Sequence, residues 1–206
     1  MTSEGVKLFV LSSPSGGGKT TVARRILRRV RELARSISVT TRRARAGERQ
    51  GRDYRFVADE VFRDLRREKR LVEWASVHGA WYGTPREPLE RLLARGRNVL
   101  LCIDVQGARK IKRAFGKRAV LIFLVPPSVE DLRQRLQRRS TDSSKAIRAR
   151  LAAAKRELAC AAWYDYRVVN AKLGDAVAQL EAIMRAHMRG ERQTITGGKL
   201  NGTGSD

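Results

Sequence analysis

A glycine-rich segment between an apolar run and an amphipathic run constrains the fold of this chain more than any other feature. The segment Ser13–Thr20 reads SPSGGGKT; the apolar Lys7–Ser12 precedes it, and a helix-like stretch from Thr21 to Leu33 follows it. The pattern G-x-x-x-x-G-K-[ST] is typical of a loop that binds phosphate groups, and here only its first glycine is replaced, by Ser13. The order of strand, glycine loop and helix predicts the start of an α/β nucleotide-binding domain.

Each part of this loop has a chemical role in holding a nucleoside triphosphate. The glycines let backbone N–H groups point inward at a β-phosphate. Lys19 supplies a positive charge near the bridge between the β- and γ-phosphates, and the Thr20 hydroxyl can hold Mg²⁺. A flexible glycine turn beside a surface lysine is the alternative, which the flanking strand and helix patterns disfavour. The ATP-binding residues predicted here are Ser13, Pro14, Ser15, Gly16, Gly17, Gly18, Lys19, Thr20 and Thr21.

The rest of the chain alternates between apolar runs typical of buried strands and stretches with helical spacing. The further strand patterns are Asn98–Asp104, Ala119–Val125 and Tyr166–Asn170. The helical patterns are Asp59–Arg70 with Asp59 as N-cap, Pro85–Arg95, Val129–Arg139, a long helix after a break at Ser140–Ser144 to about Ala162, and Asp175–Met188. Between them, Ser36–Val57 reads as short strands and turns, and Leu71–Tyr82 as extended chain. We therefore expect a parallel sheet with helices on both faces.

The high positive charge of the chain is its most unusual compositional feature. The net charge is +23 over 206 residues, with a sequence pI near 11.4, which is common in proteins that bind polyanions. The arginines are spread along the whole chain, however, so we do not expect nucleic acid to be a main partner. A positive field of this size would attract anionic nucleotides, and the attraction would weaken with salt.

The chain also lacks the patterns of membrane and secreted proteins. No apolar run approaches the roughly 20 residues that a membrane helix needs, and no basic region precedes the short apolar run near the N-terminus. Cys102 and Cys160 lie in apolar surroundings, which predicts two buried thiols rather than a disulfide or a metal site. We expect a cytoplasmic protein.

A second group of residues is suited to binding phosphate. The segment SVTTRRARAGERQGRDY, from Ser38 to Tyr54, contains Arg42 and Arg45 three residues apart, and both end residues carry hydroxyls. An arginine fork matches phosphate oxygens two at a time. On charge alone, a solvated basic loop fits this segment equally well.

Five motifs in order make the chain resemble the guanylate kinase family. They are S-V-T-T-R-x-x-R-x-G-E-x-x-G-x-D-Y-x-F-V at Ser38–Val57, V-E-W at Val72–Trp74, Y-G-T at Tyr82–Thr84, I-D-V-Q-G at Ile103–Gly107 and P-P-S-x-E-D-L at Pro126–Leu132. With the phosphate loop, the resemblance runs from Lys7 to about His187. It implies an enzyme of purine nucleotide metabolism that transfers the γ-phosphate of ATP to GMP with the help of Mg²⁺.

The resemblance also implies an architecture. A P-loop core with a three-layer arrangement around a parallel sheet would comprise residues 1–37, 85–125 and 156–189. A mixed α+β GMP-binding segment, residues 38–84, and a lid, residues 126–155, would be inserted in it. The tail of residues 190–206 lacks apolar periodicity and is expected to be disordered.

Residue roles follow from the same resemblance. The GMP phosphate would be held by Ser38, Arg42, Arg45, Tyr54 and Tyr82, and guanine would be read by Glu73, Thr84 and Asp104. Arg135, Arg139 and Arg150 would act as catalytic lid arginines beside Lys19, and Asn170 would contact the adenine of ATP. Asp104, which ends a strand pattern, is also a candidate for Mg²⁺; an aspartate that caps the turn after the strand is the alternative.

One departure from the family pattern removes a carboxylate, and three rival interpretations remain. The family usually has L-D-I-D where this chain has Leu101-Cys102-Ile103-Asp104, so one carboxylate is a thiol. The rivals are a non-catalytic guanylate-kinase-like binding module, a kinase for another phosphorylated acceptor, and a nucleic-acid-binding protein. Lys19, Arg42 and Arg45 favour an enzyme, because binding modules of this kind commonly lack them. GMP against dGMP, and monomer against homodimer, stay open.

Overall fold

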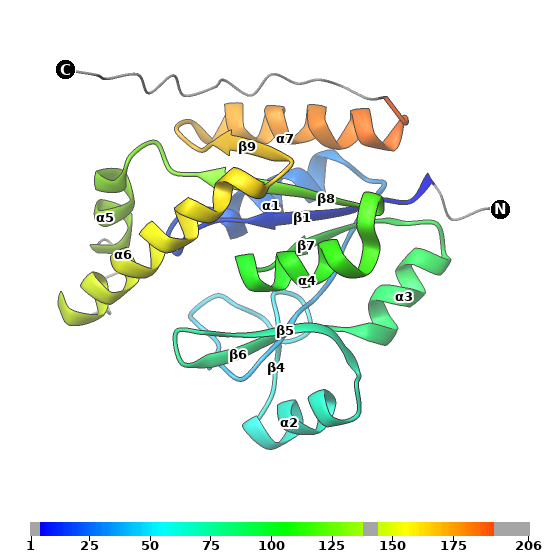
Figure 1. Ribbon diagram of the computed structural model, residues 1–206, viewed down its shortest axis with the longest axis horizontal. Helices are drawn as coiled ribbons and strands as arrows, with labels where there is room; N and C mark the ends of the chain where they lie inside the picture. The colour runs from blue at the N-terminus through cyan, green and yellow to red at the C-terminus, as the bar shows by residue number, and fades with distance from the viewer. Residues whose placement is uncertain (1–4, 138–143, 192–206) are drawn as a thin grey trace.

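The computed structural model describes residues 5–137 and 144–191, and its core is a five-stranded parallel sheet (Figure 1). The strand that leads into the glycine loop, β1, lies at the centre of the sheet, and all five of its residues are buried. The order is β2-β7-β1-β8-β9, and the strands are Leu33–Arg35, Asn98–Cys102, Leu8–Ser12, Ala119–Val125 and Tyr166–Val169. The predicted parallel sheet is therefore confirmed.

Helices cover both faces of this sheet, which gives three layers. Successive side chains of a strand point to opposite faces, so Phe9 and Leu11 of β1 pack into one hydrophobic cluster and Leu8 and Val10 into another. The first cluster includes residues of α1 (Lys19–Arg29) and α7 (Leu173–Met188), and the second includes residues of α3 (Arg86–Ala94) and α4 (Val105–Phe115). Figure 1 shows α7 above the sheet and α4 below it.

A second, mixed sheet lies beside this core. Its order is β4-β3-β6-β5, with bounds Arg55–Phe56, Val39–Thr40, Ala80–Pro85 and Leu71–Val77. Helix α2 (Asp59–Arg67) buries Phe62 and Leu65 against this sheet. Strands β5 and β6 form a hairpin whose two turn residues, His78 and Gly79, have φ values of 50° and 79°. Two consecutive positive φ angles match the turn type that suits the twist of a two-residue hairpin.

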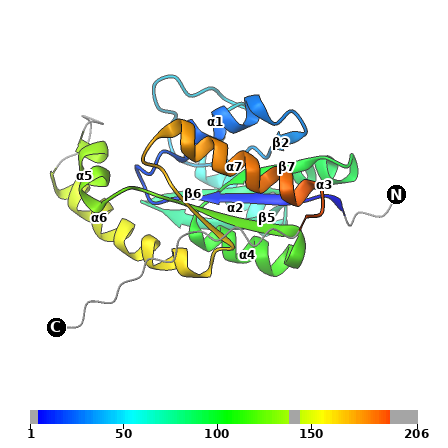
Figure 2. The same cartoon turned by 90° about the horizontal axis from the view of Figure 1, so that it is seen from above.

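Two further helices form a pair at one end of the molecule. They are α5 (Val129–Gln137) and α6 (Ser144–Ala159), and Leu132 and Leu136 of α5 pack on Ala154 of α6. Figure 2, seen from above, shows this pair at the end of the sheet opposite the N-terminus. Short 3-10 turns follow α4 and α6, at Gly116–Arg118 and Cys160–Trp163. No helix among the described residues is long and apolar enough to span a membrane.

Two local predictions are wrong. Leu33 does not end α1; the helix stops at Arg29, and Leu33 begins β2, where pairing with Asn98 of β7 and burial outweigh helical spacing. Asp59 is not the N-cap of α2, because Ala58 holds that position and Asp59 lies in the first turn. The prediction that Leu71–Tyr82 is extended is confirmed by β5 and β6, except at the hairpin turn between them. Helix α4 was not predicted.

Some predictions fall outside the described residues. Arg139, most of the break at Ser140–Ser144 and residues 192–206 of the tail are among them. Cys102 and Cys160 are free thiols, as expected, but both are only half-buried rather than fully buried.

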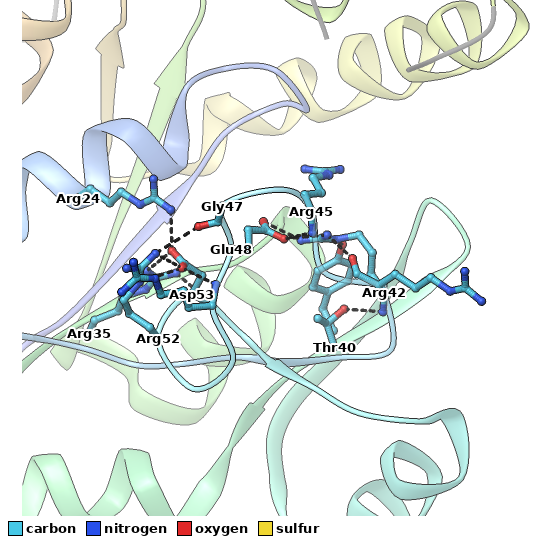
Figure 3. A network of polar contacts seen from close by, with 12 residues as sticks. Arg24, Arg35, Thr40, Arg42, Arg45, Gly47, Glu48, Arg52 and Asp53 are labelled. Carbon is cyan, nitrogen blue, oxygen red and sulfur yellow. Dashed lines mark hydrogen bonds and ion pairs between the residues drawn. The ribbon is translucent and has the colours of Figure 1, made fainter. Parts of the chain in front are cut away.

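A buried carboxylate ties the loop before β4 to the core (Figure 3). The Asp53 side chain, 2% exposed, pairs with Arg24 of α1 at 2.7 Å and with Arg52 at 2.8 Å, while Arg35 of β2 donates to its backbone carbonyl. Burial alone would raise the pKa of Asp53, but hydrogen bonds from Arg24, the Arg49 amide and Arg52 hold it well below its usual range. The loop and the core are therefore joined by charge as well as by packing.

We expect Asp53→Asn to lower the free energy of unfolding by about 2–3 kcal/mol, because it leaves several guanidinium groups without their buried partner. The loss lies near the low end for a broken buried pair, since Arg24 and Arg52 are about half exposed. Urea denaturation at neutral pH measures it. Asp64→Asn, which breaks an exposed pair with Arg67 on α2, is the matched control and should cost less than about 0.5 kcal/mol. Equal losses would contradict a central role for Asp53.

Candidate active site

One cleft at the carboxyl ends of β1 and β7 brings most of the predicted site together. Its lining includes the whole predicted phosphate loop and residues of the second sheet and its loops. Residues outside the predicted set also line it: Val77, His78, Cys102, Ile103 and Glu157. The predicted residues in the cleft are Ser13, Pro14, Ser15, Gly16, Gly17, Gly18, Lys19, Thr20, Thr21, Ser38, Arg45, Tyr54, Glu73, Tyr82 and Asp104.

The glycine loop leads directly into the N-terminus of α1. Gly16 and Gly18 have φ values of 89° and 91°, a region that residues with a Cβ rarely adopt, and the Gly17 amide donates to the Pro14 carbonyl at 2.9 Å. The first turn of α1 contains no acidic residue. The positive end of this helix and its unpaired N–H groups are therefore suited to an anion from outside the helix.

Lys19 crosses from α1 to the neighbouring strand. Its Nζ donates to the carbonyl of Ile103, just after β7, at 3.1 Å. This bond holds the ammonium group between the glycine loop and Asp104. Thr20, the next residue, is exposed in the same cleft.

Asp104 caps helix α4. Its Oδ1 accepts from the amides of Gln106 at 2.7 Å and Gly107 at 2.9 Å. The capping role that the sequence left as an alternative is therefore present. Both bonds end on Oδ1, so Oδ2 takes no part in the cap; the roles in guanine and Mg²⁺ binding remain predictions.

Glu73 is a buried carboxylate that a hydroxyl holds in place. Glu73 is 4% exposed and Thr84 is fully buried; the Thr84 hydroxyl donates to Glu73 Oε1 at 2.6 Å, from the paired position on the next strand. Burial, and to a smaller extent the charge of Asp104, raise the pKa of Glu73 to about 7, against the hydrogen bond from Thr84. Thr84 does not itself line the cleft.

Gly107 leaves the space that this carboxylate occupies. A Cβ at Gly107 would lie 2.5 Å from Glu73 Oε2, closer than any ordinary contact. The first turn of α4 therefore fixes Asp104 through its cap and makes room for Glu73 through its glycine.

Arg42 does not line the cleft, and Figure 3 shows it in a network of polar contacts with its neighbours. Its Nε donates to the Tyr82 hydroxyl at 3.0 Å, and its two Nη atoms donate to the two Glu48 oxygens, each at 3.0 Å. Glu48 Oε2 also accepts from the amide of Arg45. Burial raises the pKa of Tyr54, whose ring lies under the Arg42 guanidinium, to about 12. These contacts orient the hydroxyls and Arg45 at one end of the cleft.

Of the predicted adenine and lid residues, the three that the structure describes, Asn170, Arg135 and Arg150, do not line the cleft. Asn170 is buried; its Nδ2 donates to the Gly17 carbonyl at 2.8 Å, and its own carbonyl accepts from Arg135 at 3.0 Å. Asn170 therefore supports the glycine loop. Arg150 lies on α6 outside the lining, and Arg139 lies outside the described residues.

Comparisons with known proteins agree with this geometry. A sequence model described as guanylate kinase matches residues 5–187. The chain belongs to the guanylate kinase family. It is similar to a guanylate kinase of Oleidesulfovibrio alaskensis, with 49% identity over 85% of this chain and 84% of the relative. A guanylate kinase of Sphingopyxis alaskensis is 44% identical over 91% of this chain and 86% of the relative.

A solved structure supports the family at the level of the fold. The crystal structure of guanylate kinase from Anaplasma phagocytophilum aligns with a TM-score of 0.75 and 37% identity, over 92% of this chain and 88% of that chain. The resemblance seen in the motifs is therefore confirmed over nearly the whole chain.

Three residues with a place in the site were not predicted from the sequence. Glu48 orients Arg42, Gly107 makes room for Glu73, and Glu157 lines the cleft. Glu48 and Gly107 both stand inside motifs that carried the resemblance, so the signal was present. Glu157 had one weaker signal, since it follows Arg150 by two helical turns and so shares its face of α6.

We expect Gly107→Ala to weaken GMP binding by roughly 10- to 100-fold, because the new methyl group displaces the Glu73 carboxylate from its bond with Thr84. Calorimetric titration with GMP measures this, and thermal unfolding checks the fold. Gly174→Ala on α7, where a Cβ would meet nothing within 4 Å, is the matched control. Unchanged GMP affinity in Gly107→Ala would show that Glu73 does not touch the base.

Proposed function

We propose that the protein transfers the γ-phosphate of ATP to GMP, giving ADP and GDP. The observation that carries the proposal is the meeting of two chemically different ends in one cleft: the glycine loop with Lys19, and the buried Glu73 with Tyr54 and Tyr82. The first end suits a triphosphate and the second suits a phosphorylated guanosine. Membership of the guanylate kinase family supports the same assignment.

Glu73 is the proposed reader of guanine. Guanine presents N1–H and the N2 amino group side by side, and a carboxylate can accept from both. Thr84 holds Oε1 of this carboxylate, and Asp104 stands close enough to affect its pKa. Adenine has an acceptor at N1 and no N2 amine, so AMP would leave a buried carboxylate unpaired, which is costly.

The acceptor phosphate is assigned to the hydroxyl-lined end of the cleft. We place it among Ser38, Arg45, Tyr54 and Tyr82, with Arg42 and Glu48 orienting Tyr82 and Arg45 from behind. A phosphate monoester has a second pKa of about 6, so GMP is mostly a dianion at neutral pH. It is then already a nucleophile, and the proposed mechanism needs no general base.

The donor phosphates are assigned to the glycine loop. Its amides and the N-terminus of α1 would bind the β-phosphate, Lys19 would neutralise charge on the group in transfer, and lid arginines would add to this from α5 and α6. The arginines in this assignment are Arg135, Arg139 and Arg150. Catalysis would rest on holding two anions in line and on excluding water.

Mg²⁺ fits the donor end. The Thr20 hydroxyl and the Asp104 carboxylate line the same cleft, and hard oxygen ligands suit this ion, which protein sites commonly hold through one or two carboxylates and substrate phosphates. When bound, Mg²⁺ would reduce the negative charge of the triphosphate. We assign Thr20, with Asp104, to it.

The proposal also includes the division of the chain into segments, its location and its partners. The second sheet, from β3 to β6, supports residues 38–84 as the GMP-binding segment, and the paired α5 and α6 support residues 126–155 as the lid. Residues 1–37, 85–125 and 156–189 are left as the core. We propose a cytoplasmic enzyme, a monomer or homodimer, whose partners are ATP and GMP rather than nucleic acid.

A coupled assay of ADP production with ATP, Mg²⁺ and each of GMP, AMP, CMP and UMP tests the function. We expect fast turnover with GMP alone, and Lys19→Ala should lower kcat about 100- to 1,000-fold. Lys117→Ala, an exposed lysine away from the cleft, is the control and should keep the wild-type rate. Turnover at the wild-type rate in Lys19→Ala, or with AMP in place of GMP, refutes the assignment.

The raised pKa of Glu73 makes GMP binding depend on pH. The deprotonated form accepts the guanine donors, so affinity should rise with pH and level off above about 7, with up to tenfold change per pH unit well below that value. Titration of GMP between pH 5.5 and 8.5 measures this. In Glu73→Gln, only the pH dependence that comes from the GMP phosphate should remain, since the second pKa of that phosphate is about 6. Identical profiles in the two proteins would remove Glu73 from the guanine site.

A further inference from the structure

Glu157 is a carboxylate beside the glycine loop, where we expect the phosphates of ATP to bind. It lies in the last turn of α6 and lines both the active-site cleft and the adjoining groove beneath the β5–β6 hairpin. Its Oε2 is buried and contacts no hydrogen-bond donor among the described residues. A buried carboxylate oxygen without a partner is costly, and the proposed mechanism does not use it.

The surroundings of Glu157 combine a cation, an amide and a second carboxylate. Burial raises the pKa of Glu157, the charge of Lys19 and the backbone N–H of Ser15 act against this, and the charge of Asp104 adds to it. Asp104 shares both cavities with Glu157. Two carboxylates thus face the same space at the glycine loop, where a triphosphate would add more negative charge.

A divalent cation would resolve this conflict of charge. Mg²⁺ is typically held by one or two carboxylates together with substrate phosphates, often through retained water molecules. The carboxylates of Asp104 and Glu157 come from two different helices, α4 and α6, and Thr20 adds a hydroxyl from α1. These few ligands are better suited to binding Mg²⁺ together with ATP than to binding the ion alone.

We propose that Glu157 is a positioning residue for Mg²⁺·ATP: with Asp104 it holds the water shell of the ion against the glycine loop. The inference rests on the proposed function, since it takes Mg²⁺·ATP as the donor. Arg150 precedes Glu157 by two helical turns on the same face of α6. One helix would then present an arginine toward the phosphates and a carboxylate toward their counter-ion.

Calorimetric titration of the full chain with ATP, in Mg²⁺ and separately in EDTA, tests the role. In Mg²⁺, Glu157→Gln should bind ATP about tenfold more weakly than the wild type, a typical effect of losing a carboxylate in the outer shell of a metal. In EDTA, the same variant should bind ATP as tightly as the wild type or more tightly, because a repulsive charge is gone. Glu157→Asp should restore most of the Mg²⁺ effect.

Glu130→Gln is the matched control, because it removes an equal charge from an exposed site on α5. It should leave the ATP affinity unchanged under both conditions. Equal weakening of Glu157→Gln with and without Mg²⁺ would show a merely structural role and overturn the proposal, as would unchanged affinity in both. Thermal unfolding of each variant verifies that the fold is intact.

These titrations contain no GMP, so they separate this inference from the proposed function. Failure of the wild type to phosphorylate GMP would reject the function and leave the Mg²⁺ dependence of ATP binding to be judged by itself. Normal turnover with GMP, together with an unaltered Mg²⁺ effect in Glu157→Gln, would reject only the role of Glu157.

Discussion

The parallel pairing of β1 with β7 is the constraint on which the site depends. Their register, from Leu8 opposite Val99 to Leu11 opposite Cys102, brings the start of the glycine loop level with Ile103 and Asp104. Lys19 can reach the Ile103 carbonyl only because the two strands end at the same edge of the sheet. A shift of one residue would turn buried side chains to the opposite layer, so the two hydrophobic clusters enforce this register. Packing of the core thus sets the geometry of the phosphate end.

Buried carboxylates organise a chain that carries far more basic than acidic groups. Asp53 gathers arginines from α1 and β2 and joins the second sheet to the core, and Glu48 holds Arg42 in a two-bond fork. Glu73 differs, because a neutral hydroxyl rather than an arginine holds it, which leaves its charge for a ligand. In this protein with a net charge of +23, the few buried carboxylates therefore determine how the neighbouring arginine side chains are oriented. The arginines without such partners contribute mainly to the long-range field.

Local patterns predicted the large elements and failed where a contact from far along the chain decides. The apolar runs of β7 and β8 are long enough to stand out, and both were predicted. The three residues of β2 are too few to show any period, and only pairing with β7 defines them. Helix α4 has apolar residues at Val105, Ala108 and Ile111, a usable helical signal, but Gly107, a poor helix former, weakens it. Only glycine fits there, because the Glu73 carboxylate, on strand β5, occupies the space of a Cβ.

The site residues show the same division. The residues of the glycine loop are consecutive in the sequence, so the motif alone predicted all of them. Arg42 and Tyr82 are forty positions apart, and no local pattern indicates that the arginine binds the tyrosine hydroxyl instead of lining the cleft itself. The Thr84 hydroxyl could contact guanine or Glu73, and only the structure, which pairs the two residues across strands, shows that it donates to Glu73.

Contacts from three directions hold the glycine loop in place. Asn170, after β9, holds the Gly17 carbonyl, and Lys19 ties α1 to the end of β7. On the third side, a Cβ at Gly16 would come within 3.1 Å of both Leu132 and Leu136, so α5 packs closely on the loop itself. A loop fixed in this way binds phosphate without first having to be ordered, which favours a preorganised donor site. Because α5 packs on the loop and α6 packs on α5, the inner ends of the two helices of the proposed lid are anchored at the glycine loop, and movement of their outer ends need not disturb it.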